Sequence, residues 1–221
     1  MLRNVPPSAL HADLLAYYER IYAAAVTPDW DAAPGKEVLL NGLALLKVTG
    51  RLGATGSLVD IGCGSGYLLG RIQQEILPHW ALHGVDFAPT AIAQARARHP
   101  AIAWHCAPGE ATPLPEGSMD VAVSYGSMEH FPDPVAGVGE LARLLKPGGL
   151  FMLMLPALDA YRTDRTDEGW YPDLTGQPQW NWTRATWARA FASADLACWP
   201  LKAARPLGAR KPGVFFFGDR Q

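Results

Sequence analysis

The stretch SLVDIGCGSGYLLG, residues 57–70, runs from an apolar segment through three closely spaced glycines into a segment of helical period. A glycine inside an ordered element costs about 0.5–1 kcal/mol relative to alanine, so three together indicate that another group approaches the backbone closely. A strand, a glycine loop and a helix in this order place backbone amides and a helix N-terminus at the carboxyl end of a sheet, where open α/β folds bind ligands. The stretch therefore predicts a ligand cradle.

Around the cradle, short apolar runs alternate with segments of helical period, which is the pattern of a parallel sheet covered by helices. The predicted strands are 57–61, 81–86, 101–106, 119–125 and 150–156, followed by two closing strands within 197–204 and 213–220. The predicted helices are 66–77, 90–99 and 134–146, with two N-terminal helices within 8–26 and 36–52 and one within 183–195. We expect a single Rossmann-like α/β domain with a mostly parallel seven-stranded sheet and helices on both faces.

The domain division follows from the same pattern. Residues 1–54 are predicted to form two N-terminal cap helices, and residues 55–221 the ligand-binding domain. Within it, residues 157–182 look irregular and rich in aromatic side chains. A long irregular segment in a compact domain is often functional, which favours a lid at 157–182 that binds a second substrate, called the acceptor below. The alternative is a surface loop that its aromatic side chains hold against the sheet edge. In that case the acceptor pocket is lined by Tyr17, Tyr18 and Tyr22.

Charge and cysteine content exclude several classes of function. The chain has 221 residues, 19 Lys plus Arg against 21 Asp plus Glu, and three cysteines at 63, 106 and 198. This balance gives no strong field for nucleic acid, and the cysteines lack the spacing of a disulfide framework or a zinc site. No apolar run is long enough for a bilayer. We expect a soluble cytoplasmic protein without a metal.

A nicotinamide dinucleotide is the first candidate ligand, because its GxGxxG fingerprint also follows a strand. The third glycine of that fingerprint is missing here: the sixth position is Tyr67 counted from Gly62 and Leu69 counted from Gly64. The pattern DxGxGxG beginning at Asp60 instead resembles the first motif of the class I S-adenosylmethionine-dependent methyltransferases.

Four further stretches resemble the same family in the same order. They are HGVDFAP (83–89), GEATPLPEGSMD (109–120), SYGSMEHFPDP (124–134) and LARLLKPGGLFMLMLP (141–156). The resemblance covers roughly residues 55–156 and is closest to the small-molecule subgroup called type 11.

The resemblance implies S-adenosylmethionine as cofactor, with a separate group of residues for each part of it. The implied cofactor-binding residues are Asp60, Gly62, Cys63, Gly64, Gly66 and Tyr125 at the methionine end, Asp86 at the ribose, and Phe87, Glu110 and Ala111 at the adenine. Glu110 departs from the aspartate more usual at its position. The loop amides are expected to face the cofactor carboxylate, and Asp86 to accept hydrogen bonds from the ribose hydroxyls.

Transfer of the methyl group from S-adenosylmethionine depends mainly on positioning of the nucleophile. Acid catalysis is not needed, because the leaving group is a neutral thioether. A general base is required only for a protonated acceptor, and His130 is the candidate because it follows the fourth strand of the parallel series. Glu129 beside it is an alternative group for holding the loop or a cationic acceptor. A small molecule is the expected acceptor. The alternatives are a cofactor-binding protein without turnover, an RNA-modifying enzyme using the basic residues 202–220, and, more distantly, a nicotinamide dehydrogenase.

Overall fold

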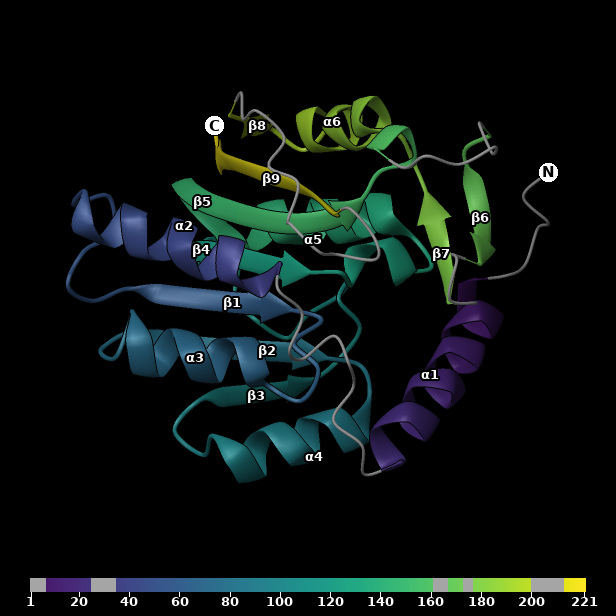
Figure 1. The fold of residues 1–221 in the computed structure, drawn as a ribbon, viewed down its shortest axis with the longest axis horizontal. Helices are drawn as coiled ribbons and strands as arrows, with labels where there is room; N and C mark the ends of the chain where they lie inside the picture. Colours follow the sequence, from purple (N-terminus) through teal and green to yellow (C-terminus); the bar gives the residue numbers. More distant parts are fainter. Residues whose placement is uncertain (1–6, 25–34, 161–166, 173–176, 200–212) are drawn as a thin grey trace.

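The fold is seen in a computed structural model, which describes residues 7–24, 35–160, 167–172, 177–199 and 213–221 (Figure 1). The helices are α1 (Pro7–Ala23), α2 (Lys36–Val48), α3 (Tyr67–Glu75), α4 (Pro89–Arg98), α5 (Pro134–Leu144) and α6 (Arg184–Ala192), with short 3-10 turns η2 (Met128–His130) and η3 (Leu158–Ala160). The strands are β1 (Ser57–Ile61), β2 (Ala81–Asp86), β3 (Ala103–Cys106), β4 (Met119–Tyr125), β5 (Leu145–Pro156), β6 (Gly169–Pro172), β7 (Pro178–Asn181), β8 (Leu196–Cys198) and β9 (Gly213–Arg220).

Seven of these strands form one sheet in the order β3-β2-β1-β4-β5-β9-β8. The first five neighbours in this order pair in parallel, while β9 runs antiparallel between β5 and β8. The strands β1, β2 and β4 are runs of mostly buried residues, as expected of strands covered on both faces. The predicted α/β fold with a mostly parallel seven-stranded sheet is confirmed.

The chain order reverses between β1 and β4. From β1 it proceeds to β2 and β3 on one side, and it returns to β4 and β5 on the other. In open α/β sheets a ligand binds outside the carboxyl ends of the strands at such a switch point. The glycine loop after β1 and the loop after β4 therefore face the same crevice.

Helices cover both faces of the sheet, as predicted. On one face α2, α3 and α4 bury Leu39, Leu69 and Ile92, and on the other α5 and α6 bury Leu141 and Trp187. Figure 1 shows α2, α3 and α4 in front of the strands and α5 behind them. The helix α2 therefore belongs to the same apolar core as the strands that follow it.

The helix α1 lies elsewhere, across the carboxyl ends of the strands beside the hairpin of β6 and β7 (Figure 1). It is attached to α4, because the Glu19 carboxylate accepts hydrogen bonds from the Thr90 amide at 2.9 Å and its hydroxyl at 2.6 Å. The Gln94 side chain donates to the Tyr22 carbonyl at 2.8 Å. The two N-terminal helices thus occupy different places, and only α1 covers the ligand end of the sheet.

Two predicted strand starts and the predicted character of one segment need correction. β3 begins at Ala103 rather than residue 101, and β5 begins at Leu145, directly after α5, rather than at residue 150. The early start of β5 follows from the pairing of Leu145 with Met119 across an irregularity in the register. The segment 157–182, expected to be irregular, contains the antiparallel hairpin of β6 and β7. None of the helices in the described ranges has the length and apolarity to cross a membrane.

Candidate functional site

The loop after β1 depends on glycine. Gly62, Gly64 and Gly66 have φ angles of 77°, 53° and 81°, a region that side chains rarely adopt. A Cβ atom on Gly64 would lie 2.6 Å from the Tyr22 hydroxyl oxygen, and one on Gly66 would lie 2.6 Å from Cη2 of Trp104. The loop is therefore held close to α1 on one side and to β3 on the other.

Several amides of this loop are hydrogen-bonded within the protein. The Gly62 and Cys63 amides donate to the Val85 carbonyl at 2.8 and 3.0 Å, and the Gly64 amide donates to the Asp86 carboxylate at 2.9 Å. The loop amides and the helix N-terminus were together expected to face the ligand carboxylate, and of these groups the structure directs three amides to β2. The Cys63 side chain packs in the core, where burial raises the pKa of its thiol.

Asp60, near the end of β1, is 2% exposed. Burial raises the pKa of its carboxyl to about 7, against the opposing effect of the Lys36 ammonium. Its Oδ1 atom has no hydrogen-bond partner among the residues that the structure describes. A buried carboxylate oxygen without a donor is costly, and it indicates a missing donor group.

Asp86, at the end of β2, is also buried, and burial raises the pKa of its carboxyl to about 6. Its Oδ1 accepts from the Ala88 amide and its Oδ2 from the Gly64 amide, both at 2.9 Å. Each carboxylate oxygen can accept a second hydrogen bond. The side chain is therefore rigidly held and retains the acceptor capacity that two ligand hydroxyls require.

The predicted adenine positions are also placed by the structure. The Glu110 carboxylate accepts from the Asp133 amide at 3.5 Å and lies 3.6 Å from His11 Nε2 of α1. Burial raises the pKa of its carboxyl. The Ala111 amide donates to the Pro108 carbonyl at 3.2 Å, so the predicted contact with a ring nitrogen would have to compete with this turn.

Tyr18 of α1 contacts residues that follow both β2 and β4. Its ring meets Phe87 edge-on at 5.7 Å and His130 at 6.0 Å between centroids. Its hydroxyl accepts from Gln177 Nε2 at 3.3 Å. Burial, followed by the charge of Glu129, raises the pKa of the Tyr18 hydroxyl. The structure thus brings together a predicted adenine neighbour, the candidate base and a tyrosine first considered only for an alternative pocket.

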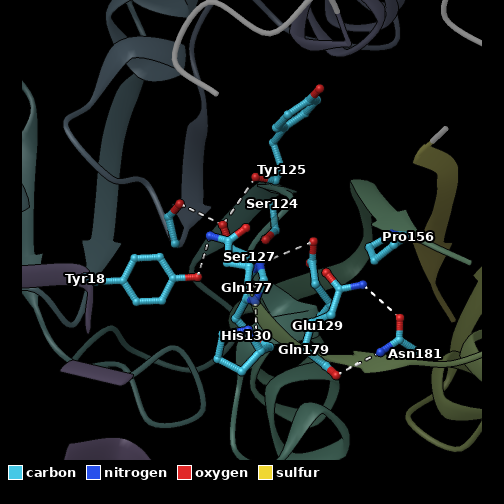
Figure 2. Close-up of polar contacts among 12 residues, drawn as sticks. Tyr18, Ser124, Tyr125, Ser127, Glu129, His130, Pro156, Gln177, Gln179 and Asn181 are labelled. Atoms are coloured by element: carbon cyan, nitrogen blue, oxygen red, sulfur yellow. Dashed lines mark hydrogen bonds and ion pairs between the residues drawn. The ribbon is translucent and has the colours of Figure 1, made fainter. Parts of the chain in front are cut away.

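His130 lies in the turn η2 after β4, and it is buried beside Glu129 (Figure 2). Its Nδ1 is 2.8 Å from the Pro178 carbonyl oxygen, and its Nε2 is 3.8 Å from Glu129 Oε1. A carbonyl oxygen only accepts, so Nδ1 carries a proton here. Nε2 is then the nitrogen that can exchange a proton with a neighbour.

The strand β7 presents amide side chains to this end of the sheet. Figure 2 shows Gln177 and Gln179 close to His130 and Glu129, with Asn181 further along. The Gln179 Nε2 donates to Asn181 Oδ1 at 3.0 Å, and both side chains are buried. Residues two apart lie on one face of a strand. This polar face was not foreseen, although the alternation in PQWN is its sequence signal.

The aromatic residues of 157–182 mostly contact one another. Trp170, Trp180, Trp182 and Trp187 follow each other with ring centroids 5.6, 5.7 and 4.7 Å apart, which joins the hairpin to α6. The Trp180 indole donates to the carbonyl of the residue after His130 at 2.9 Å. Tyr161 lies outside the described residues, as do the basic positions 202–211.

Tyr125, the last residue of β4, is half-buried, and burial raises the pKa of its hydroxyl to about 12. The Lys36 ammonium lies 5.6 Å from the centre of its ring and 5.1 Å from that of Tyr67. Lys36 was not identified from the sequence, although a lysine at the first position of a helix is an unfavourable placement that could have marked it. The described part of the chain contains no cluster of three metal-ligating side chains.

Residues 59–153 match the family model of a methyltransferase domain. A malonyl-[acyl-carrier protein] O-methyltransferase of Hahella chejuensis is 35% identical over 133 residues, covering 59% of this chain and 46% of that protein. A probable S-adenosylmethionine-dependent methyltransferase of Mycolicibacterium smegmatis is 31% identical over 102 residues, covering 45% of this chain and 37% of that protein. The chain therefore spans less than half the length of either relative.

The fold is also similar to that of solved structures. The 1,6-didemethyltoxoflavin-N1-methyltransferase of Burkholderia thailandensis, solved with bound 1,6-didemethyltoxoflavin and S-adenosylhomocysteine, aligns with a TM-score of 0.75 at 14% identity. The alignment covers 100% of this chain and 93% of that one. At this identity the likeness concerns the fold alone.

Proposed function

We propose, from the premise that residues 59–153 are a methyltransferase domain of the class I S-adenosylmethionine-dependent family, that this protein transfers a methyl group from that cofactor to a small polar molecule. One observation carries the proposal: the switch point of the sheet brings two sets of groups together. The glycine loop, Asp60 and Asp86 lie on the β1 and β2 side, and Glu129 and His130 lie on the β4 side.

The residues of the first set fit S-adenosylmethionine. Asp60 offers a buried oxygen that lacks a donor, and the glycines allow close approach to the backbone. Asp86 is held by two amides and is suited to two ribose hydroxyls. When bound, the cofactor supplies a methyl group on a sulfonium, which is activated for displacement by a nucleophile.

The protein's contribution is to position and desolvate the acceptor. Alignment of a nucleophile in a fixed geometry lowers a barrier by roughly 7–11 kcal/mol. The helix α1 and the hairpin of β6 and β7 flank the crevice, and Tyr18 and Gln177 of these two elements are hydrogen-bonded to each other. Together they would exclude water from the acceptor.

His130 is the proposed general base for an acceptor that must lose a proton. The Pro178 carbonyl fixes the proton on Nδ1, so Nε2 is the atom assigned to proton transfer. Glu129, 3.8 Å from Nε2, would stabilise the imidazolium that results. The same carboxylate would favour an acceptor that carries an N–H or O–H group.

The acceptor is proposed to be a small molecule rather than a nucleic acid or a lipid chain. The polar face of β7 beside His130 suits a compound with hydrogen-bonding groups. The overall charge, 19 basic against 21 acidic residues, gives little attraction to phosphate backbones. With three free cysteines, the protein is proposed to work in the reducing cytoplasm.

The experiment that tests this function uses the full chain with methyl-labelled S-adenosylmethionine and a metabolite extract. Labelled product and S-adenosylhomocysteine should accumulate together, and the product's identity would give the acceptor. His130→Ala should reduce the rate by roughly 100- to 10,000-fold for a protonated acceptor while cofactor binding is retained. Tight cofactor binding without any labelled product from the extract would instead indicate a binding protein.

A further inference from the structure

We propose that His83 of β2 and His105 of β3 form a two-histidine site for a divalent transition-metal ion, represented by Zn²⁺. The ion would bridge Nδ1 of His83 and Nε2 of His105, with water at its remaining coordination positions. The proposal does not depend on methyl transfer, because neither histidine is among the residues assigned to the cofactor or to the acceptor.

The sheet places the two histidines on one of its faces. The strands β2 and β3 pair in parallel, with His83 opposite Ala103 and Val85 opposite His105. Residues two apart along a strand point to the same side, so both imidazoles lie on the side of Val85. β3 is the edge strand, and both histidines are partly exposed, so an ion can reach them from solvent. The pair is 22 residues apart in the sequence, too far for a local metal-binding motif.

The distance between the facing ring nitrogens corresponds to a shared metal ion. His83 Nδ1 is 3.4 Å from His105 Nε2, and the ring planes are inclined by 20° with their centroids 5.6 Å apart. This separation is longer than the range of about 2.7–3.2 Å typical of hydrogen bonds with an N–H donor. Two Zn–N bonds of about 2.0–2.1 Å at a tetrahedral angle place their nitrogens about 3.3–3.4 Å apart. The two imidazoles are thus spaced as ligands of one ion.

Both imidazoles favour the neutral form that binds metal ions. Partial burial lowers the pKa of both rings, and neighbouring positive charge adds to this effect, from His105 on His83 and from Arg96 on His105. The Arg96 guanidinium itself donates to the Trp104 carbonyl at 3.0 Å. Its charge also opposes a bound cation, so we expect binding to require both imidazoles together.

The donor set determines the class of ion. Imidazole nitrogen suits Zn²⁺, Cu²⁺ and Ni²⁺, whereas Mg²⁺ and Ca²⁺ prefer oxygen ligands. Within the described ranges no third metal-ligating side chain joins such a group, so the protein supplies two ligands. Ala103, opposite His83, is exposed, and its small side chain leaves that side of the imidazole open to water. A bound ion would link the edge strand β3 to β2.

The test is a calorimetric titration of the full chain with ZnCl2, after removal of metals with a chelator and without thiols, at about pH 7.5, where imidazole is neutral. One ion should bind per chain. Loss of an outer partner of a metal ligand costs roughly 10- to 100-fold in affinity, and loss of the ligand itself should cost at least as much. His83→Gln and His105→Gln should therefore each weaken Zn²⁺ binding by about tenfold or more.

Two matched controls remove other groups that could bind Zn²⁺. His79→Gln replaces an exposed histidine just before β2, and Cys106→Ser replaces the exposed thiol that follows His105. Both variants should bind Zn²⁺ like wild type. Loss of binding in Cys106→Ser, with binding retained in His83→Gln, would overturn the proposal.

Nitrogen-15 spectra of the imidazole rings identify the ligands in the wild-type protein, so they decide the question even if a glutamine variant fails to fold. Added Zn²⁺ should first shift the resonances of His83 Nδ1 and His105 Nε2. The assignment is wrong if other histidines shift first, or if both glutamine variants keep the wild-type affinity for Zn²⁺.

Discussion

Among single residues, Asp86 has a carboxylate that both holds the protein together and is proposed to bind the ligand. It accepts from the Gly64 and Ala88 amides, and it is the proposed partner of the ribose hydroxyls. Asp86→Ala is expected to weaken S-adenosylhomocysteine binding by about 1.5–3 kcal/mol, the range for hydrogen bonds to a charged group. Calorimetry measures this directly.

The control for this change is Asp120→Ala. Asp120 lies near the amino end of β4, where its carboxylate accepts from Ser57 and pairs with Lys146. Its loss should lower stability without changing affinity. If Asp86→Ala keeps wild-type affinity in a folded protein, Asp86 does not belong to the site.

Asp60 should make stability depend on pH. The folded protein retains the Asp60 proton up to about pH 7, whereas an unfolded chain releases it near pH 4. The unfolding free energy should therefore fall as pH rises from about 4 to 7, and Asp86 acts in the same direction. Asp60→Asn removes one titration, so its melting temperature should decline less between pH 5 and 7.5. Parallel pH profiles of the two proteins would contradict the raised pKa.

The candidate site residues that could be predicted from the sequence belong to short contiguous motifs, and Asp60 and Asp86 are examples at strand ends. Tyr18 was considered only for an alternative pocket, and Lys36 was not singled out, for the opposite reason. Their places near the crevice arise from how α1 and α2 pack against residues far along the chain. No local pattern carries that information.

Among the elements, α1 is attached to α4 through the Glu19 carboxylate. Glu19 accepts from the Thr90 amide in the first turn of α4, where an unpaired amide would otherwise remain. Glu19→Ala should cost about 1 kcal/mol in the free energy of unfolding, as for a lost helix cap. Urea denaturation gives this value, and hydrogen exchange should accelerate first in α1.

Glu75→Ala is the comparison for this change. The Glu75 carboxylate pairs with Arg71 on the surface of α3, and exposed pairs of this kind contribute little. Its urea midpoint should stay close to that of wild type. Uniform hydrogen exchange in the Glu19 variant would mean that α1 is held mainly by its apolar contacts.

The type of an element could be predicted where a short apolar run is consistent only with a buried strand. The strands at 57–61, 81–86 and 119–125 appear with the expected bounds because they are covered on both faces. The hairpin at 169–172 and 178–181 was not foreseen, since each strand has a proline and few aliphatic residues. It is stabilised by contacts to α6 and η2, which lie outside the segment.

For the molecule as a whole, the cofactor should act as a stabilising ligand. Binding to the folded state alone adds about 2.7 kcal/mol at a ligand concentration one hundred times Kd. For a chain of this length, that corresponds to a rise in Tm of roughly 5–10 °C with S-adenosylhomocysteine. A nicotinamide dinucleotide should leave Tm unchanged, because the GxGxxG fingerprint is missing. A reversed preference in thermal scans would point to a dehydrogenase.

The row of indole rings from Trp170 to Trp187 gives the molecule an optical property. Neighbouring rings lie 4.7 to 5.7 Å apart, so excitation absorbed by one passes readily to the others. These four residues are half of the eight tryptophans in the chain, and one end of the row lies in the hairpin beside the crevice. The ultraviolet emission of this row is therefore expected to change together when the acceptor side is occupied, over the emission of the four tryptophans elsewhere in the chain, which provides a readout without an attached dye.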